Sequence, residues 1–395
     1  MPETENNLSS VRSRRVVVTA LGVAQTLAWA SSYYLPAILA DPIGASLGVP
    51  RSVIFAAFSM ALLIAAFAGP AVGRVIDRYG GRGVLALSNI VLAAGLVVLA
   101  AANGIVSLFA AWAILGVGMA LGLYDAGFAA LAALYGHTAR GPITGITLFA
   151  GFASTVSWPL STFLNDAVGW RDCVLVWAAL NLVIGLPLNR FLLPLPVRPA
   201  QISLARAPSI GWKPHREMFL LAFVFAAAWF VTGAMASQLP TLLERAGASP
   251  VQAVAAAALV GPAQVAARLG EFLILRRIHP LVSARIAALL HPLGAAAFAL
   301  IGAPAAALFA IFYGAGNGLL TIARGTVPLA VFGPASYGER TGLLGAPARS
   351  AQAFAPLLFG LLLDAEGVYA AIFVSAALCL AAFAALLGLR AAPAR

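Results

Sequence analysis

Charged residues are scarce in this sequence. Only 9% of its 395 residues are Asp, Glu, Lys or Arg, whereas 62% are hydrophobic. Soluble domains average about 25% charged and about 45–50% apolar residues, so this composition leaves too little polar surface to cover a water-soluble fold. We therefore expect an integral membrane protein whose main contact is the lipid bilayer.

Cysteine is equally rare. Cys173 and Cys379 both lie in apolar runs, without metal-ligand or redox spacing, which is typical of small buried side chains. The sequence also lacks a phosphate-binding Gly-x-x-x-x-Gly-Lys pattern and a His-Glu-x-x-His zinc motif. These absences argue against an ATP-driven pump and against an intramembrane enzyme, and we expect no cofactor and no metal.

Basic residues outnumber acidic ones and give a formal net charge of +11. They do not form patches interleaved with aromatic residues, but stand singly or in small groups between apolar runs. That distribution is typical of membrane topology signals. We therefore expect no nucleic-acid partner.

A window of about 20 residues divides the apolar runs into twelve predicted membrane spans. The spans cover 16–40, 52–72, 83–103, 107–135, 142–165, 172–193, 217–243, 250–274, 281–302, 304–330, 342–363 and 367–390. The expected domains are an N-terminal tail (1–15), a six-helix bundle (16–193), a proline-rich linker (194–216), a second six-helix bundle (217–390) and a C-terminal tail (391–395).

The orientation follows from the distribution of Lys and Arg. One side of the predicted membrane holds only Arg51, Arg171 and Arg245, and most other basic residues outside the spans fall on the opposite side. By the positive-inside rule that basic side is cytoplasmic, together with both termini and the linker. We expect a multi-pass protein of the cell (inner) membrane, with the monomer as the simplest state.

A short turn rich in Gly and Arg connects the second and third spans. Residues 73–82 read GRVIDRYGGR, between two runs that are nearly free of charge. The pattern Gly-x-x-x-Asp-Arg-x-Gly-x-Arg at this place resembles the loop signature of the major facilitator superfamily of secondary transporters. The resemblance implies an all-α integral membrane fold with twelve transmembrane helices in two pseudo-symmetric bundles, which expose a central site to either side in turn.

The resemblance also implies a gating role for this turn, carried by Gly73, Asp77, Arg78, Gly80 and Arg82. In the family, the carboxylate at the position of Asp77 faces the N-terminus of the eleventh helix, which we expect to start near residues 341–345. A helix N-terminus favours an anion. This contact is expected to hold the cytoplasmic side shut, and the simpler alternative is a hairpin whose arginines only set the topology.

Five charged residues lie deep inside predicted spans, away from the span ends: Asp125, Arg268, Glu271, Arg324 and Arg349. Burying a charge in lipid costs at least about 2.5 kcal/mol, so each should face water or an opposite charge. They mark either a path for substrate and ions or ion pairs that only hold helices together. The second interpretation has more weight for Glu271 and Arg349, which lie nearer the cytoplasmic ends.

The tenth span carries a polar stripe. Asn317, Thr321 and Arg324 recur at i, i+4 and i+7, on one helix face. A guanidinium is permanently charged and binds a carboxylate through two parallel hydrogen bonds. The stripe therefore predicts a site for an oxygen-rich anion, with Arg324 as its first contact.

The eighth span repeats this arrangement with Gln264, Arg268 and Glu271. An arginine eight residues before Arg276 resembles the monocarboxylate-transporter and oxalate–formate-antiporter branch, in which an eighth-span arginine binds the substrate carboxylate. Eukaryotic members of that branch carry a lysine in the first span, where this sequence reads SSYYLP at 31–36. Glu271 is an alternative partner that neutralises Arg268.

Asp125 in the fourth span is the predicted proton-coupling residue, with Glu271 as a second candidate. A carboxyl that alternates between a dry site and an arginine changes its affinity for a proton, so it can bind and release one. The alternative is a permanent pair of Asp125 with Arg324 or with Arg268. The sequence does not choose between these partners.

Side chains of the first and seventh spans complete the predicted substrate site: Gln25, Trp29, Tyr33 and Trp229. Trp and Tyr also anchor helices at membrane interfaces, an alternative that applies to Tyr34 and Trp212. Gln25 and Trp29 lie too deep in the first span for that role.

These features predict a secondary transporter for a small organic anion, with a monocarboxylate favoured, moved with or against protons. The alternative is an efflux pump for an apolar drug or for a neutral solute such as a metalloid hydroxide. The sequence does not separate import from export.

Overall fold

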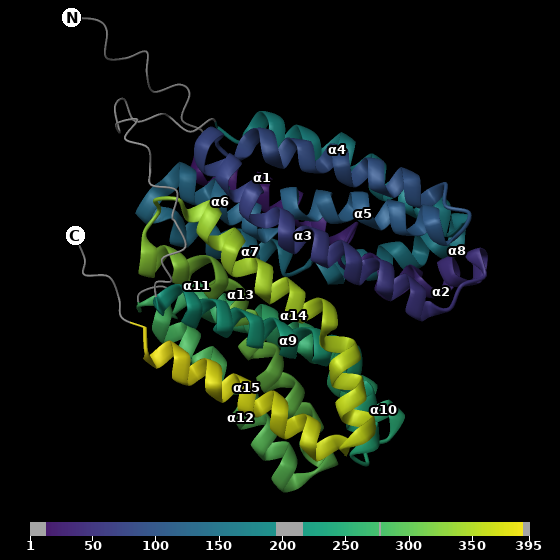
Figure 1. Cartoon of the computed structure of the whole chain (residues 1–395), viewed down its shortest axis with the longest axis vertical. Helices are drawn as coiled ribbons and strands as arrows, with labels where there is room; N and C mark the ends of the chain where they lie inside the picture. The colour runs from purple at the N-terminus through teal and green to yellow at the C-terminus, as the bar shows by residue number, and fades with distance from the viewer. Residues whose placement is uncertain (1–12, 195–215, 276–277, 390–395) are drawn as a thin grey trace, which may run out of the picture.

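The computed structural model describes residues 13–194, 216–275 and 278–389, which form helices joined by short turns, with no strand among them. Figure 1 shows the first half of the chain, in purple to teal, packed against the second half, in green to yellow. The predicted linker and tails lie almost wholly outside the described residues, as do Arg276, Arg277 and Trp212. The all-α membrane fold that the sequence predicts is confirmed.

The first half contains eight α-helices and three short helical turns. They are α1 (Arg14–Ala30), α2 (Leu35–Leu47), α3 (Arg51–Tyr79), α4 (Gly81–Ala100), α5 (Ile105–Gly122), α6 (Tyr124–Tyr135), η1 (Gly136–Ala139), α7 (Arg140–Ala150), α8 (Ala153–Leu180) and the π-helical turns η2 (Asn181–Gly185) and η3 (Leu188–Leu192).

The second half is built in the same way from long apolar helices. Its described elements are α9 (Arg216–Arg245), α10 (Pro250–Ala258), α11 (Val260–Leu273), α12 (Pro280–Ile301), η5 (Ala303–Ala305), α13 (Ala306–Phe332), α14 (Tyr337–Ala365) and α15 (Gly367–Leu387).

Within the described ranges, nine helical segments are long and apolar enough to cross a membrane. One of them runs over 88 residues, Ile105–Leu192, and glycines with positive φ interrupt it at Gly136 (53°) and Gly169 (85°). We interpret it as three traverses, because Gly80 has the same φ of 85° at the turn between α3 and α4. With α14, whose polar residues lower its hydropathy, this division gives the twelve predicted spans.

The outer surface of the bundle is apolar. Phe67, Val106 and Leu300 are 76%, 84% and 86% exposed, on three different elements. Large apolar side chains this exposed would be costly in water, whereas they match lipid tails. The hydrophobic runs of the sequence therefore face both the protein interior and the bilayer.

Four helical traverses are interrupted within the described residues. The breaks lie at residues 31–34 between α1 and α2, at Leu123 between α5 and α6, at 151–152 between α7 and α8, and at Leu259 between α10 and α11. A break frees backbone carbonyls from their helical partners. Side chains take up two of the carbonyls next to the breaks: Gln25 donates to Gly122, and Ser157 donates to Ala30.

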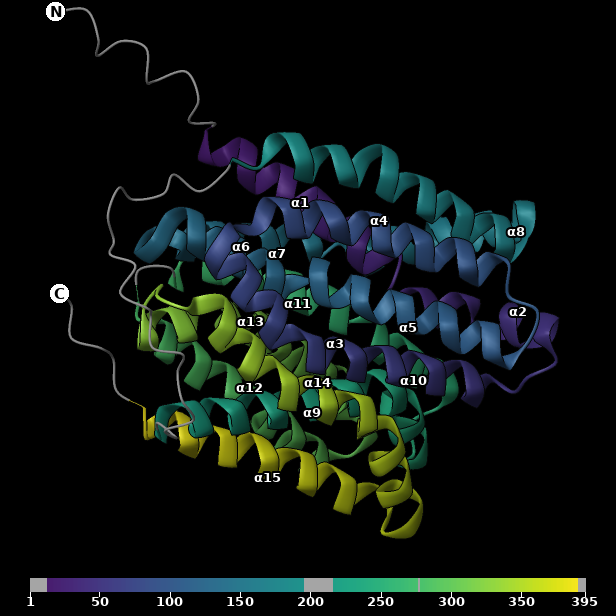
Figure 2. The ribbon, with the colours of Figure 1, turned by 45° about the horizontal axis from the view of Figure 1, so that its top comes forward.

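The two halves of the chain meet along α3 and α14, which lie side by side in both views (Figures 1 and 2). Glycines make the approach close. A Cβ added at Gly342 would lie 2.6 Å from the carbonyl oxygen of Gly69, and one added at Gly73 would collide with the carbonyl of Gly338. This seam joins the halves at the end of the bundle where α3 ends and α14 begins.

Candidate functional site

Asp125 binds two arginines from the other half of the chain. Its Oδ2 atom lies 2.6 Å from Nη2 of Arg324 on α13 and 2.9 Å from Nη2 of Arg349 on α14. All three side chains are less than 10% exposed. The sequence left the partner of Asp125 open between Arg324 and Arg268, and the structure gives Arg324 together with Arg349.

Local structure explains the position of the carboxylate. Leu123 is extended (φ −83°, ψ −172°), so α6 begins at Tyr124 and Asp125 lies in its first turn, where the helix dipole favours an anion. Gly345 on α14 leaves room for the pair, since a Cβ there would lie 2.9 Å from Asp125 Oδ2 and 3.1 Å from Arg324 Nη2.

Each of the two arginines has a further partner besides Asp125. The guanidinium of Arg324 lies 4.5 Å from the centre of the Trp229 ring, in cation–π geometry. Arg349 donates through Nη1 to the carbonyl of Ala65 on α3, at 2.8 Å. Thus Trp229, the predicted site residue of the seventh span, is in contact with Arg324, the residue first expected to bind the substrate.

Arg268 on α11 is also buried, but its partners are neutral. It donates to the carbonyl of Thr147 at 3.4 Å and to Oε1 of Gln264 at 3.5 Å. Its Nε atom has no hydrogen-bond partner among the described residues. The alternative in which Glu271 neutralises Arg268 is not seen, because Glu271 pairs with another arginine.

That arginine is Arg140, at the start of α7. Its Nη2 lies 3.0 Å from Oε1 of Glu271, and the Glu271 side chain is 2% exposed. The same guanidinium of Arg140 also donates to the carbonyls of Leu275 and Ile278. Burial, together with the charges of Arg140 and Arg285, lowers the pKa of His279 in the adjacent loop. Glu271 therefore joins the two halves near the end of α11, through an ion pair separate from that of Asp125.

The remaining predicted site residues lie in different places, and of these only Tyr33 forms a hydrogen bond to the opposite half of the described structure. Asn317 accepts a hydrogen bond from Thr232 at 3.0 Å, and Thr321 donates to the carbonyl of Asn317 on its own helix. Tyr33 accepts a hydrogen bond at 2.7 Å from Gln352 of α14, and its ring lies 5.1 Å from that of Trp29. Gln25 is 1% exposed and packs inside the first half.

The carboxylate of Asp77 lies at the N-terminus of α14. Oδ1 accepts from the backbone N–H of Gly338 and Oδ2 from that of Glu339, both at 2.8 Å. Arg74 adds an ion pair to Glu339 at 3.3 Å across the same seam. The helix begins at Tyr337, four residues before the expected start near 341–345. The polar residues 337–341, which the hydrophobic window left outside the span, are therefore its first turn.

The other residues of the gating motif stay within the first half. Gly80 adopts a positive φ that allows the sharp turn, and Arg78 lies over the ring of Tyr79. Arg82 donates to the carbonyl of Arg190 at 2.5 Å. Of this motif, only Gly73 and Asp77 are seen in direct contact with α14.

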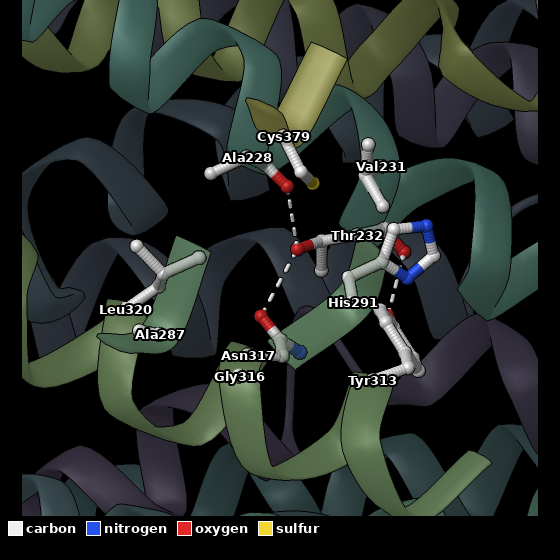
Figure 3. A pocket seen from close by; sticks show the side chains of 10 residues that line it. All are labelled: Ala228, Val231, Thr232, Ala287, His291, Tyr313, Gly316, Asn317, Leu320 and Cys379. Atoms are coloured by element: carbon white, nitrogen blue, oxygen red, sulfur yellow. Dashed lines mark hydrogen bonds between the residues drawn. The ribbon is translucent and has the colours of Figure 1, made fainter. Parts of the chain in front are cut away.

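A small cavity lies inside the second half, against α9, α12, α13 and α15 (Figure 3). Its volume is about 20 Å³, and Thr232, His291, Tyr313 and Asn317 contribute polar atoms around it. His291 bonds to Ser375 through Nε2, whereas its Nδ1 has no partner among the described residues. A cavity of this volume holds about one water molecule, so it is too small to be the substrate site.

Sequence reasoning underrated Arg349 and read Arg140 only as a topology signal. The pattern Arg349-x-x-Gln352 was the available signal, since it puts two polar side chains on one face of an apolar helix. Within the described ranges, no group of three or more His, Cys, Asp or Glu side chains could hold a metal ion.

Comparison with known proteins gives one family and several solved structures. The model of the Major Facilitator Superfamily matches residues 21–327. The human organic anion transporter MFSD10 (TETRAN) has a TM-score of 0.74 and 18% identity, covering 95% of this chain and 100% of its own. A search of curated proteins finds no match.

Two further structures share the fold. The proton:xylose symporter XylE, bound to 6-bromo-6-deoxy-D-glucose, has a TM-score of 0.72 and 15% identity, over 94% of this chain and 95% of its own. A bacterial homologue of the iron transporter ferroportin, in an outward-facing state, has a TM-score of 0.74 and 15% identity, over 94% and 98%. The helical membrane fold, the glycine-rich seam and the family match over most of the sequence lead to one conclusion: the chain belongs to the Major Facilitator Superfamily of transporters and is not an enzyme.

Proposed function

We propose that this secondary transporter moves a small organic anion, with a monocarboxylate as the simplest substrate. The observation that carries the proposal is the charge of the central site. Arg324, Arg349 and Arg268 are all buried where the two halves meet, and of these three only Arg324 and Arg349 bind a described carboxylate, which they share. Three guanidiniums and one carboxylate leave two positive charges to be compensated, and an anionic substrate supplies the missing charge.

A neutral substrate fits this site less well. Buried cations without partners cost several kcal/mol, and a sugar or a metalloid hydroxide brings no charge to offset that cost. The fork geometry of a guanidinium matches a carboxylate in particular. The structural relatives are an organic anion transporter, a proton:xylose symporter and a homologue of an iron transporter, so the fold itself does not select the substrate.

Proton coupling is assigned to Asp125. Its Oδ2 atom holds both arginines, while Oδ1 is buried and has no partner in the described part of the chain. A proton on Oδ1 removes the charge of the carboxylate and so weakens its ion pairs with both guanidiniums. The arginines are then free to bind the substrate. Alternating access then follows from opening and closing the seam between α3 and α14. We assign this end of the bundle, together with both termini, to the cytoplasmic side.

The test is transport in proteoliposomes. Purified protein under an imposed pH gradient is expected to accumulate labelled lactate or another short monocarboxylate. Arg324→Ala should abolish this flux and Arg324→Lys should restore part of it, because a lysine keeps the charge but loses the fork. Arg51→Ala is the matched control, since Arg51 forms an exposed ion pair with Asp41.

Two outcomes would contradict the proposal. If the folded protein transports no carboxylate and instead protects cells against toxic compounds, the drug or neutral-solute alternative is correct. If Asp125→Asn still accumulates substrate against its gradient when pH alone drives the flux, the proton is not carried by Asp125. Loss of pH-driven accumulation with retained exchange across the membrane is the expected result.

A further inference from the structure

Aromatic rings form a continuous group in the first half of the chain. We call Trp29, Tyr33, Tyr34, Phe58, Tyr124 and Trp158 the aromatic cluster. Ring centres are 4.8 Å apart for Trp29 and Tyr124, 5.3 Å for Tyr33 and Tyr34, 5.4 Å for Tyr33 and Phe58, and 6.1 Å for Tyr34 and Trp158. Most of these pairs are edge-to-face or tilted, which are favourable geometries for aromatic contacts.

The cluster surrounds two of the helix breaks. Tyr33 and Tyr34 lie in the interruption between α1 and α2, and Tyr124 is the first residue after the break between α5 and α6. Interrupted transmembrane helices are a common way to build substrate sites near the middle of the bilayer. Tyr33 and Tyr34 are not fully buried, and Trp158 is 44% exposed, so the group is not a closed core.

The cluster is adjacent to the buried cations. Tyr124 directly precedes Asp125, whose carboxylate holds Arg324 and Arg349. Tyr33 bonds to Gln352, one turn after Arg349 on α14. The guanidinium of Arg268 lies beside Gly151, at the break between α7 and α8 that leads into the helix of Trp158. The aromatic cluster is thus linked to the residues that hold the buried cations, by sequence adjacency at Tyr124 and by a hydrogen bond at Tyr33.

We propose that the transported anion is an aromatic carboxylate, whose carboxyl group binds the arginines while its ring packs against the aromatic cluster. This inference rests on the proposed function and narrows its substrate. The Nε1 donor of Trp29 is buried without a partner among the described residues. It supplies a hydrogen bond to an oxygen substituent on the ring, so hydroxylated benzoates are the best-matched members of the class.

The experiment compares two carboxylates that differ in aromaticity and little in size. Proteoliposomes take up labelled benzoate in competition with unlabelled benzoate, 4-hydroxybenzoate or cyclohexanecarboxylate. Edge-to-face contacts favour the aromatic ring by about two- to tenfold for each pair of rings. We therefore expect benzoate and 4-hydroxybenzoate to compete at concentrations at least about fivefold lower than cyclohexanecarboxylate.

Leucine variants of two cluster residues test whether the aromatic preference arises at the cluster. Tyr34→Leu and Trp158→Leu should each bring benzoate and cyclohexanecarboxylate closer to equal competition, while Tyr34→Phe keeps the ring and the preference. Phe163→Leu is the matched control, because Phe163 lies on the same helix as Trp158 and is 67% exposed. A monodisperse gel-filtration profile checks that each variant is folded.

The possible failures are distinguishable. If the wild-type protein transports benzoate and cyclohexanecarboxylate equally well, or if the leucine variants keep the aromatic preference, the cluster is packing only and this inference is wrong, whereas anion transport stands. If no carboxylate of either kind is transported by the folded protein, the proposed function itself fails.

Discussion

The Oδ1 atom of Asp77 lies 2.8 Å from the backbone nitrogen of Gly338, across the seam between the two halves of the chain. Glu339 offers a second N–H to the same carboxylate at an equal distance. An anion that accepts two free N–H groups at a helix N-terminus gains from hydrogen bonding and from the helix dipole together. This contact stabilises the state in which α3 and α14 are closed.

Asp77→Asn is expected to slow transport without unfolding the protein. The amide keeps the shape of the side chain but loses the charge, so the closed state loses about 1–2 kcal/mol, a factor of about 5–30 in its population. Initial uptake rates in proteoliposomes measure the effect, and a thermal melt checks the fold. Asp41→Asn removes an exposed carboxylate and should behave as wild type. A normal rate in Asp77→Asn at normal expression would remove the gating role.

Gly73→Ala tests the seam by shape alone. The added Cβ would collide with the backbone carbonyl of Gly338, and a backbone cannot move aside as a flexible side chain does. We expect uptake to fall by at least about tenfold, since α3 and α14 no longer close. Gly83→Ala on α4 is the control, because a Cβ there meets nothing within 4 Å. Equal activity of the two variants would show that close approach of these helices is not needed for transport.

The pair of Arg140 and Glu271 should act mainly on stability, and unequally. Arg140→Gln leaves Glu271, which is 2% exposed, without its charge partner, and such a loss costs about 3–5 kcal/mol. Glu271→Gln leaves a partly exposed arginine and should cost less. The double variant is expected to melt close to Glu271→Gln alone, as measured by thermal unfolding in detergent. Additive losses in the double variant would mean that the two charges do not interact.

Asp125→Ala should convert the internal pair into an anion-binding site that depends on added ligand. Without the carboxylate, Arg324 and Arg349 are buried cations without a counter-charge, which destabilises the fold by about 3–5 kcal/mol. Added monocarboxylate should therefore raise the melting temperature of this variant more than that of wild type. Chloride at equal ionic strength serves as the salt control, and Asp166→Ala as the exposed control variant. An equal shift in both proteins would argue that carboxylates do not reach these arginines.

The sequence was sufficient for the membrane class, the fold and the positions of most helices, because each rests on local composition. A run of about 20 apolar residues has to cross the bilayer whatever its neighbours are. The tight connection between the second and third spans was also predicted, but it is confined to Gly80, because residues 73–79 continue α3. The boundaries deviated most at the ends of the first two spans, because α2 runs to Leu47 and α3 to Tyr79, each seven residues beyond the predicted ends at 40 and 72.

The partners of the buried charges could not be predicted in the same way. Arg324 and Asp125 are 199 positions apart in the chain, and no local pattern relates them. Arg268 and Glu271 are one turn apart and looked like a pair, yet Arg140 from the other half takes Glu271.

Composition and periodicity by themselves determined that this chain spans a membrane as a helical bundle, because the choice between water and lipid is made residue by residue. Only the tertiary structure decided which cation neutralises which carboxylate, and that Arg349 belongs to the central site. The physical reason is that a buried ion is satisfied by whichever opposite charge the packing of the two halves brings within about 3 Å, at any distance along the sequence.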